Sequence, residues 1–97
     1  MRLKIGDSEI PESTLTSVVS VLGTPTVTFS GVAKGDEGSD LIRILKQSAR
    51  KDSISFEAVD VTGTSSAGTC KLFNLKCEEV TTRPRLVIYS GELLQSY

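Results

Sequence analysis

Alternation of apolar and polar residues is the feature that most limits how this chain can fold. In the run Thr26-Val27-Thr28-Phe29-Ser30, the apolar side chains fall on one side and the hydroxyl side chains on the other. A period of two residues predicts a β-strand with one buried face and one face in water, which is the usual pattern of antiparallel sheets. Strand-period runs also cover residues 3–5, 15–22, 53–61, 70–77 and 86–89.

One segment changes from the strand period to the helical period. Its apolar residues recur on one side of a helix and its polar residues cover the opposite side: Leu41, Ile42, Leu45 and Ala49 against Arg43, Lys46, Gln47 and Arg50. Ser39 is an N-cap residue type, and the acidic residues near it and the basic residues near position 50 complement the helix dipole. We therefore expect a helix near residues 39–51, preceded by a polar, glycine-rich loop at residues 34–38.

Turn-forming residues separate the strand runs and indicate how they connect. Gly6-Asp7-Ser8 predicts a short hairpin arm over residues 3–10, which Pro11 ends because proline has no N–H for the ladder. Further turns are expected at residues 23–25, 62–68 and 81–84, and short turns favour antiparallel pairing. We expect a single β-rich domain over residues 1–97, mainly β with one α-helix. Its architecture would be an antiparallel two-layer β-sandwich or a partly open barrel, with the helix packed on an opening or an edge.

The absence of histidine excludes several kinds of chemistry. With no His among its 97 residues, the chain has no Ser-His-Asp or Cys-His nucleophile pair and no histidine metal ligand. The 12 acidic residues fall mostly in expected loops or on the polar sides of strands, and aromatic residues, which a sugar-binding cleft needs, make up only 5% of the chain. We expect no enzyme, no cofactor, and no catalytic, cofactor-binding or metal-binding residues.

The cysteines, Cys70 and Cys77, lie an odd number of positions apart in one expected strand. Successive side chains of a strand point to opposite faces, so this spacing places the two thiols on opposite sides of the sheet, where they cannot form a disulfide. We expect both to be free thiols that act as small apolar side chains in the core.

The segment at residues 35–40 and the basic residues are the remaining candidate ligand sites of the sequence. Three acidic residues in that segment would repel phosphate, and their spacing does not match a calcium-binding EF-hand loop. Basic residues occur at Arg83-Pro84-Arg85 and on the helix at Lys46, Arg50 and Lys51, without forming a continuous stripe. The net charge of −1 also argues against capture of nucleic acid or of an anionic membrane. We expect no specific nucleic acid, no membrane and no small-molecule partner.

The N-terminal residues lack the apolar core of a signal peptide. The most apolar stretch, residues 15–22, is interrupted by Ser and Thr and is far shorter than the roughly 20 residues that a membrane span needs. We therefore expect a protein made in the cytoplasm without an export signal.

The order of elements from residue 23 onward resembles a known family. A turn leads into the strand at residues 26–29, and a helix carrying Leu41-Ile42-Arg43 follows a polar segment. Strands at residues 53–60 and 70–77 come next, and the closing strand ends in Gly91-Glu92-Leu93-Leu94. Over residues 23–94 this order is similar to that of the tail tube proteins of contractile and long-tailed phages and of related phage-like injection machines.

The resemblance implies a structural role without catalysis. Tube subunits form hexameric rings whose sheets join into a continuous inner barrel, and the rings stack on one another. The N-terminal part of this chain is shorter than that of a usual tube subunit, which leaves a tail terminator, a tube initiator or a baseplate protein open as roles. The expected partners are further copies of the chain in a ring and other tail proteins, in an infected or lysogenic bacterium and then in the virion.

A second function remains open from the sequence. A small monomeric binding or adaptor module without catalytic activity would have the same composition and the same lack of catalytic residues. The two functions differ in oligomeric state, since tube-like assembly needs open strand edges that pair with neighbouring copies. The N-terminal arm at residues 3–10 is the predicted edge because it is short and lies at the end of the chain.

Overall fold

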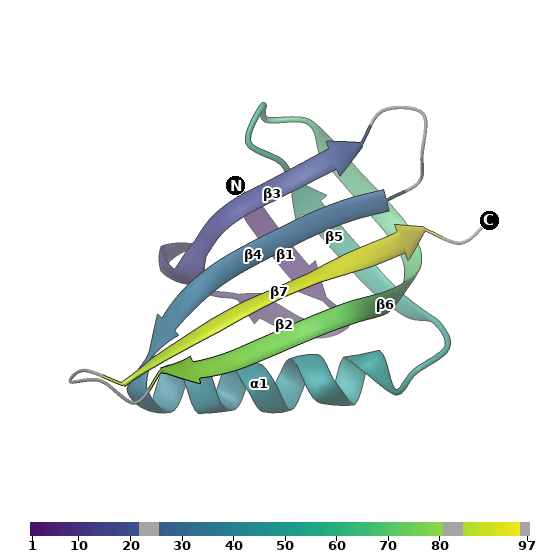
Figure 1. Cartoon of the computed structure of the whole chain (residues 1–97). Helices are drawn as coiled ribbons and strands as arrows, with labels where there is room; N and C mark the ends of the chain where they lie inside the picture. Colours follow the sequence, from purple (N-terminus) through teal and green to yellow (C-terminus); the bar gives the residue numbers. More distant parts are fainter. Residues whose placement is uncertain (22–25, 81–84, 96–97) are drawn as a thin grey trace.

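The strands form one antiparallel sheet in the order β2-β1-β5-β6-β7-β4-β3 (Figure 1). The computed structural model describes residues 1–21, 26–80 and 85–95. Within these ranges the elements are β1 (Arg2–Ile5), β2 (Ser8–Ile10), the 3-10 turn η1 (Glu12–Thr14), β3 (Leu15–Val21), β4 (Thr26–Lys34), α1 (Gly35–Ala49), β5 (Ile54–Val59), β6 (Ser65–Val80) and β7 (Leu86–Gln95).

The predicted fold class is confirmed: the chain is mainly antiparallel β with one α-helix. The sheet is open, and it curls so that β3, β4, β7 and β6 lie in front of β1, β2 and β5 in Figure 1, with α1 along the lower end. The N-terminal hairpin arm is also confirmed, since β1 pairs with β2 across the Gly6-Asp7 turn. The predicted turns at residues 23–25 and 81–84 lie outside the described residues.

The core fills the space enclosed by the curled sheet and α1. Alternate residues of each strand are buried there, as the period of two predicts. The largest fully buried side chains come from six strands and the helix: Tyr89, Phe29, Leu3, Ile5, Ile10, Leu45, Leu72, Leu93 and Val18 among them.

The predicted loop at residues 34–38 is wrong, because α1 begins at Gly35 rather than near residue 39. Lys34 occupies the N-cap position without a side-chain hydrogen bond, and the Gly35 N–H donates to the Arg85 carbonyl oxygen at 3.1 Å. Gly38 is buried where α1 crosses β7, and a Cβ atom there would lie 2.6 Å from Cγ2 of Val87. This glycine therefore permits close packing of the helix on the sheet and does not mark a loop.

The predicted turn at residues 62–68 is too long, because β6 begins at Ser65. Ser65, Ser66, Ala67 and Gly68 pair with Val59 to Phe56 of β5 in unbroken register. Small and polar residues lie in this part of β6 because most of them face solvent, so their composition resembles that of a loop. The actual connection covers residues 60–64 and is called here the 60–64 turn.

The placement of Cys70 and Cys77 on opposite faces is also wrong. The register between β6 and β7 shifts between Phe73 and Lys76, and Asn74 has a φ of 53° in this bulge. The extra residue returns Cys77 to the core side, where it packs against the same cluster that contains Cys70. Both thiols are free. At roughly 3.3 Å per residue their separation along one strand still prevents a disulfide.

The buried face of α1 gives a test of the helix assignment. Leu45 is fully buried, whereas its neighbour Lys46 is exposed. Leu45→Ala should lower the free energy of unfolding by about 2–5 kcal/mol, because it leaves a cavity in the core. Lys46→Ala should change that free energy by less than about 0.5 kcal/mol. Urea unfolding followed by circular dichroism measures both values, and equal losses would contradict the assigned face.

Candidate assembly surface

The sheet has two edges, β2 and β3, at which backbone groups are left without a partner strand. The edge predicted in the N-terminal arm is present, since β2 is the last strand on that side and β1 pairs with both β2 and β5. The second edge, β3, was not predicted. The two edges differ in length and in charge.

The β2 edge is short and charged. The Gly6 N–H donates to the Ser55 carbonyl oxygen at 2.7 Å, so the backbone groups of Leu3 and Ile5 face β2 by the alternation of an antiparallel ladder. Glu9 is then the residue of β2 whose backbone faces outward. A strand of three residues with a charged side chain at its centre resists pairing with another strand.

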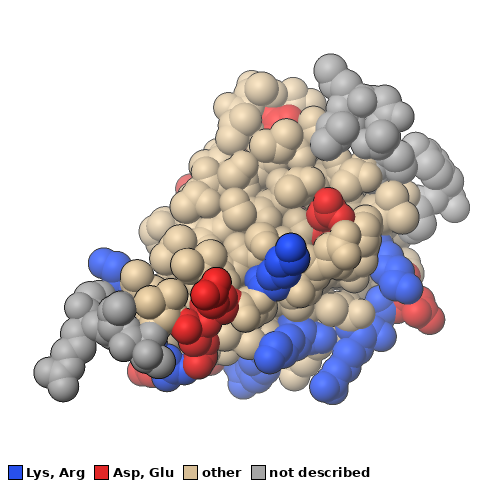
Figure 2. All heavy atoms as spheres, viewed as in Figure 1, with Lys and Arg blue, Asp and Glu red and all other residues tan. Residues whose placement is uncertain are grey.

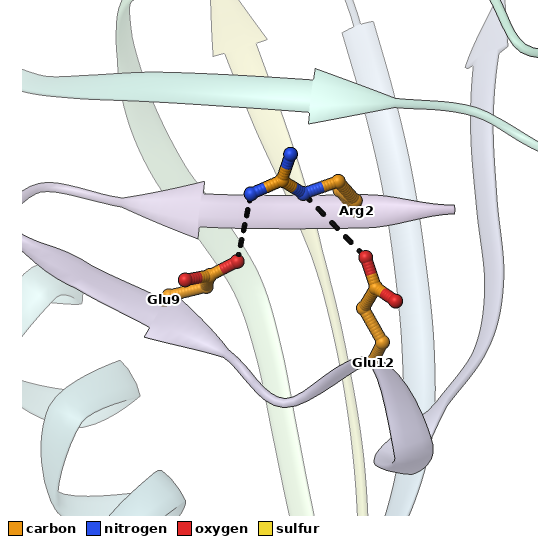
Figure 3. A network of polar contacts seen from close by, with 3 residues as sticks. All are labelled: Arg2, Glu9 and Glu12. Carbon is orange, nitrogen blue, oxygen red and sulfur yellow. Dashed lines mark hydrogen bonds and ion pairs between the residues drawn. The ribbon is translucent and has the colours of Figure 1, made fainter.

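An exposed ion-pair network covers this edge (Figure 3). Arg2 Nη2 lies 3.1 Å from Glu9 Oε1, and Arg2 Nε lies 3.5 Å from Glu12 Oε1. The hydrogen bond to Glu9 raises the pKa of Arg2 further above its usual value. All three side chains are largely exposed, so solvent and salt screen the network and it adds little to stability. Its main consequence is a charged surface along β1 and β2.

The β3 edge is long and uncharged. Its seven residues, Leu-Thr-Ser-Val-Val-Ser-Val, include no charged residue and no proline. The Val18 carbonyl oxygen accepts a hydrogen bond from the Val61 N–H at 3.0 Å on the side away from β4. By the alternation of the ladder, Val18 and Ser20 therefore direct their backbone groups outward. High β-propensity without charge or proline is typical of strands that pair readily with another chain.

The 60–64 turn lies beside this edge and is internally well ordered. Oδ1 of Asp60 accepts hydrogen bonds from the Thr62 hydroxyl at 2.6 Å, the Thr62 N–H at 2.9 Å and the Thr64 N–H at 3.0 Å. The Gly63 N–H donates to the Asp60 carbonyl oxygen at 3.0 Å. Val61 and Thr62 have negative φ, so residues 60–63 form a type I turn. The Thr62 hydroxyl bond lowers the pKa of Asp60 despite its burial.

The solvent-facing side of β3, β4 and β7 carries exposed apolar residues among hydroxyl side chains. Val19, Val32, Ile88 and Leu94 are each 36–42% exposed, and Val32 lies directly opposite Ile88. Figure 2 shows this face as largely free of charge over β3 and β4, with basic side chains gathered toward α1. Together, the β3 edge and this face form a surface of low charge, on which Lys34 and Glu92 are the charged residues of β3, β4 and β7. Another protein chain can contact this surface.

The residues considered earlier as ligand sites do not converge on one another. Asp36 and Glu37 lie exposed in the first turn of α1, and Asp40 pairs with Arg43 at 3.6 Å. Across residues 1–21, 26–80 and 85–95, no group of three or more His, Cys, Asp or Glu side chains is placed to hold a metal ion.

The basic residues and the thiols also lie apart. Lys46, Arg50 and Lys51 are exposed on or just after α1, and Arg85 pairs with Glu79. Arg83 and Pro84 lie outside the described residues. Burial raises the pKa of the Cys70 thiol to about 11 and also raises that of Cys77, so both thiols stay protonated at neutral pH and are poor nucleophiles.

A hollow of about 400 Å³ lies over β1, β5 and β6. Its charged lining combines Arg2 and Lys4 with Glu9 and Glu57, so the lining favours neither cations nor anions.

None of the described helical segments is long and apolar enough to cross a membrane.

Comparisons of the chain with protein-family models, with curated proteins and with solved structures found no match.

The residues on which the resemblance to tail tube proteins rests lie in α1 and β7. Leu41 and Arg43 lie in the second turn of α1, and Gly91-Glu92-Leu93-Leu94 forms the second half of β7, paired with β4 and β6.

The Asp60 carboxylate gives a test by pH. Its pKa is lower in the folded chain than in the unfolded one, so its contribution to stability is complete above the unfolded value of about 4 and is lost as pH falls through the folded value. Asp60→Asn should therefore be less stable than the parent at pH 7, and the difference should shrink below about pH 4. Urea unfolding at pH 7 and pH 3 measures this difference. A difference that stays constant between the two pH values would contradict it.

Proposed function

We propose that the chain is a structural, self-assembling subunit of a phage tail or of a related injection machine. It would act as a tail tube-like ring subunit, a tail terminator or a baseplate component. The observation that carries the proposal is the β3 edge: a seven-residue strand without charge that bounds an open sheet. The element order over residues 23–94 supports the choice of tail proteins among structural proteins.

Strand pairing between copies gives this edge a physical use. Neighbouring subunits would add main-chain hydrogen bonds along β3. A ring needs β3 to pair with a different segment of its neighbour, because β3 against β3 would close as a two-fold dimer. The net charge of −1 allows copies to approach one another without strong mutual repulsion. The hydroxyl-rich face of β3 and β4 suits a ring lumen, because Lys34 is the one charged residue of these two strands and so they offer little basic surface that would hold passing DNA.

The alternative is a small monomeric binding or adaptor module without catalytic activity. The charged, three-residue β2 edge favours it, since natural proteins use short charged edges to stay separate. The hollow over β1, β5 and β6 would then be its contact surface. In both functions the chain would be made in the cytoplasm, and in the first it would end in the virion.

Oligomeric state as a function of concentration tests the proposal. Multi-angle light scattering from micromolar to millimolar concentration should show a hexamer or another higher oligomer. Thr16→Lys places a charge on the β3 edge and should hold the chain as a folded monomer, because lysine opposes strand pairing. Thr28→Lys makes the same change one strand inward, on the exposed face of β4, and should leave edge pairing intact.

Circular dichroism would check that both variants remain folded. A parent chain that stays monomeric at millimolar concentration, also when mixed with tail proteins encoded beside it, would contradict assembly and leave the binding module as the better function.

A further inference from the structure

The 60–64 turn lies against the β3 edge and occupies part of it. The Val61 N–H donates to the Val18 carbonyl oxygen at 3.0 Å, where an added strand would otherwise donate. Beside this contact, the buried Ser20 hydroxyl lies near the Asp60 carboxylate. The middle of β3 is therefore covered by a turn of the same chain.

The turn is held together independently of β3. The Asp60 carboxylate bonds with Thr62 and Thr64, and the Asp60 N–H donates to the Thr64 carbonyl oxygen at 3.0 Å. Among the backbone hydrogen bonds of the described residues outside the regular ladders, the Val61–Val18 bond joins the turn to β3. The Val61 side chain is 57% exposed, so it buries little apolar surface against the edge. The hydrogen bonds within the turn let it keep its shape when it moves away from β3, and that movement also separates the Asp60 carboxylate from the Ser20 hydroxyl.

The chemistry of β3 favours another copy of this chain as the occupant of the edge. Its seven residues carry no charge, so a strand laid beside it meets no like charge and no unpaired charge. Copies of a chain with a net charge of −1 repel one another only weakly.

We propose that the β3 edge accepts a strand of a second copy of this chain, and that the 60–64 turn covers the edge until the incoming strand displaces the Val61–Val18 hydrogen bond. This proposal rests on the proposed self-assembly and adds the surface that pairs and the contact that restrains it. The turn then inhibits premature strand pairing within the chain's own structure, and assembly begins when its hydrogen bond to the Val18 carbonyl oxygen breaks.

Val61→Pro removes the covering hydrogen bond, and its ring Cδ replaces the amide hydrogen and presses against the Val18 carbonyl oxygen, which also pushes the turn away from β3. Val61 is the second residue of a type I turn, a position at which proline is common. Its side chain is largely exposed. Proline has no N–H and so cannot donate to Val18. Val61→Ala is the matched control, since it also removes the branched side chain of valine but keeps the backbone N–H. Circular dichroism and urea unfolding verify that both variants keep the fold.

Light scattering over a concentration series then compares the two variants with the parent chain. If the turn restrains pairing, Val61→Pro should assemble at a concentration about three- to tenfold lower than Val61→Ala, which corresponds to the usual net strength of one hydrogen bond. Hydrogen exchange on the assembled material should show new protection of the β3 amides. Assembly of Val61→Pro alone, with the parent chain monomeric, would also support the proposal.

Two results would overturn it. If the parent chain assembles but Val61→Pro and Val61→Ala behave alike and the β3 amides gain no protection, the proposed self-assembly stands and the role of the turn is wrong. If all three chains remain monomeric at millimolar concentration, the β3 edge does not pair with a second copy, and the proposed self-assembly fails with it.

Discussion

The contact of Tyr89 with β4 and η1 determines how the two ends of the sheet are arranged. Tyr89 is fully buried, and its hydroxyl lies 2.7 Å from the hydroxyl of Thr14, which itself donates to the Pro11 carbonyl oxygen at 2.8 Å. Gly31 makes room for it, because any Cβ there would overlap the tyrosine ring and the Thr14 backbone. Since η1 connects β2 directly to β3, this contact ties the link between the two edge strands to the middle of the sheet. The contact thereby helps to hold the two edge strands in place relative to the middle of the sheet.

Local periodicity was sufficient to predict most of the fold. The strands at residues 26–32 and 86–89 and the helical face with Leu41 and Leu45 are as expected, because burial on one side imposes the same period on sequence and structure. The errors share a cause. Gly38 and the start of β6 have the composition of loops, yet their small residues serve close packing or face solvent within regular structure. The bulge at Asn74 reverses the phase of β6, and the apolar residues change phase with it, from Cys70 and Leu72 to Leu75 and Cys77. In the sequence alone this change looks like a strand with apolar residues on both faces.

The candidate surface was less predictable, because an edge is a property of the whole sheet. The N-terminal arm could be placed at an edge from its length and its position in the chain, whereas the exposure of β3 follows from the strand order β7-β4-β3. Two local signals were present. The strand at residues 15–21 lacks charge, and Asp60 followed by Gly63 is the sequence of a type I turn. Neither signal reveals that the turn lies against that strand, since the contact joins residues more than forty positions apart in the chain.

This separation has a consequence for the order in which the chain folds during synthesis. β3 emerges from the ribosome well before residues 60–64, and its partner β4 is followed by the helix and β5 before the turn exists. Throughout that interval the Val18 carbonyl oxygen lacks the hydrogen bond that the 60–64 turn later donates. The β3 strands of nascent chains on neighbouring ribosomes can then pair with one another, since unpaired strand edges make partly folded β proteins prone to aggregation. The rate of translation through the helix and β5 therefore sets how long this vulnerable state lasts.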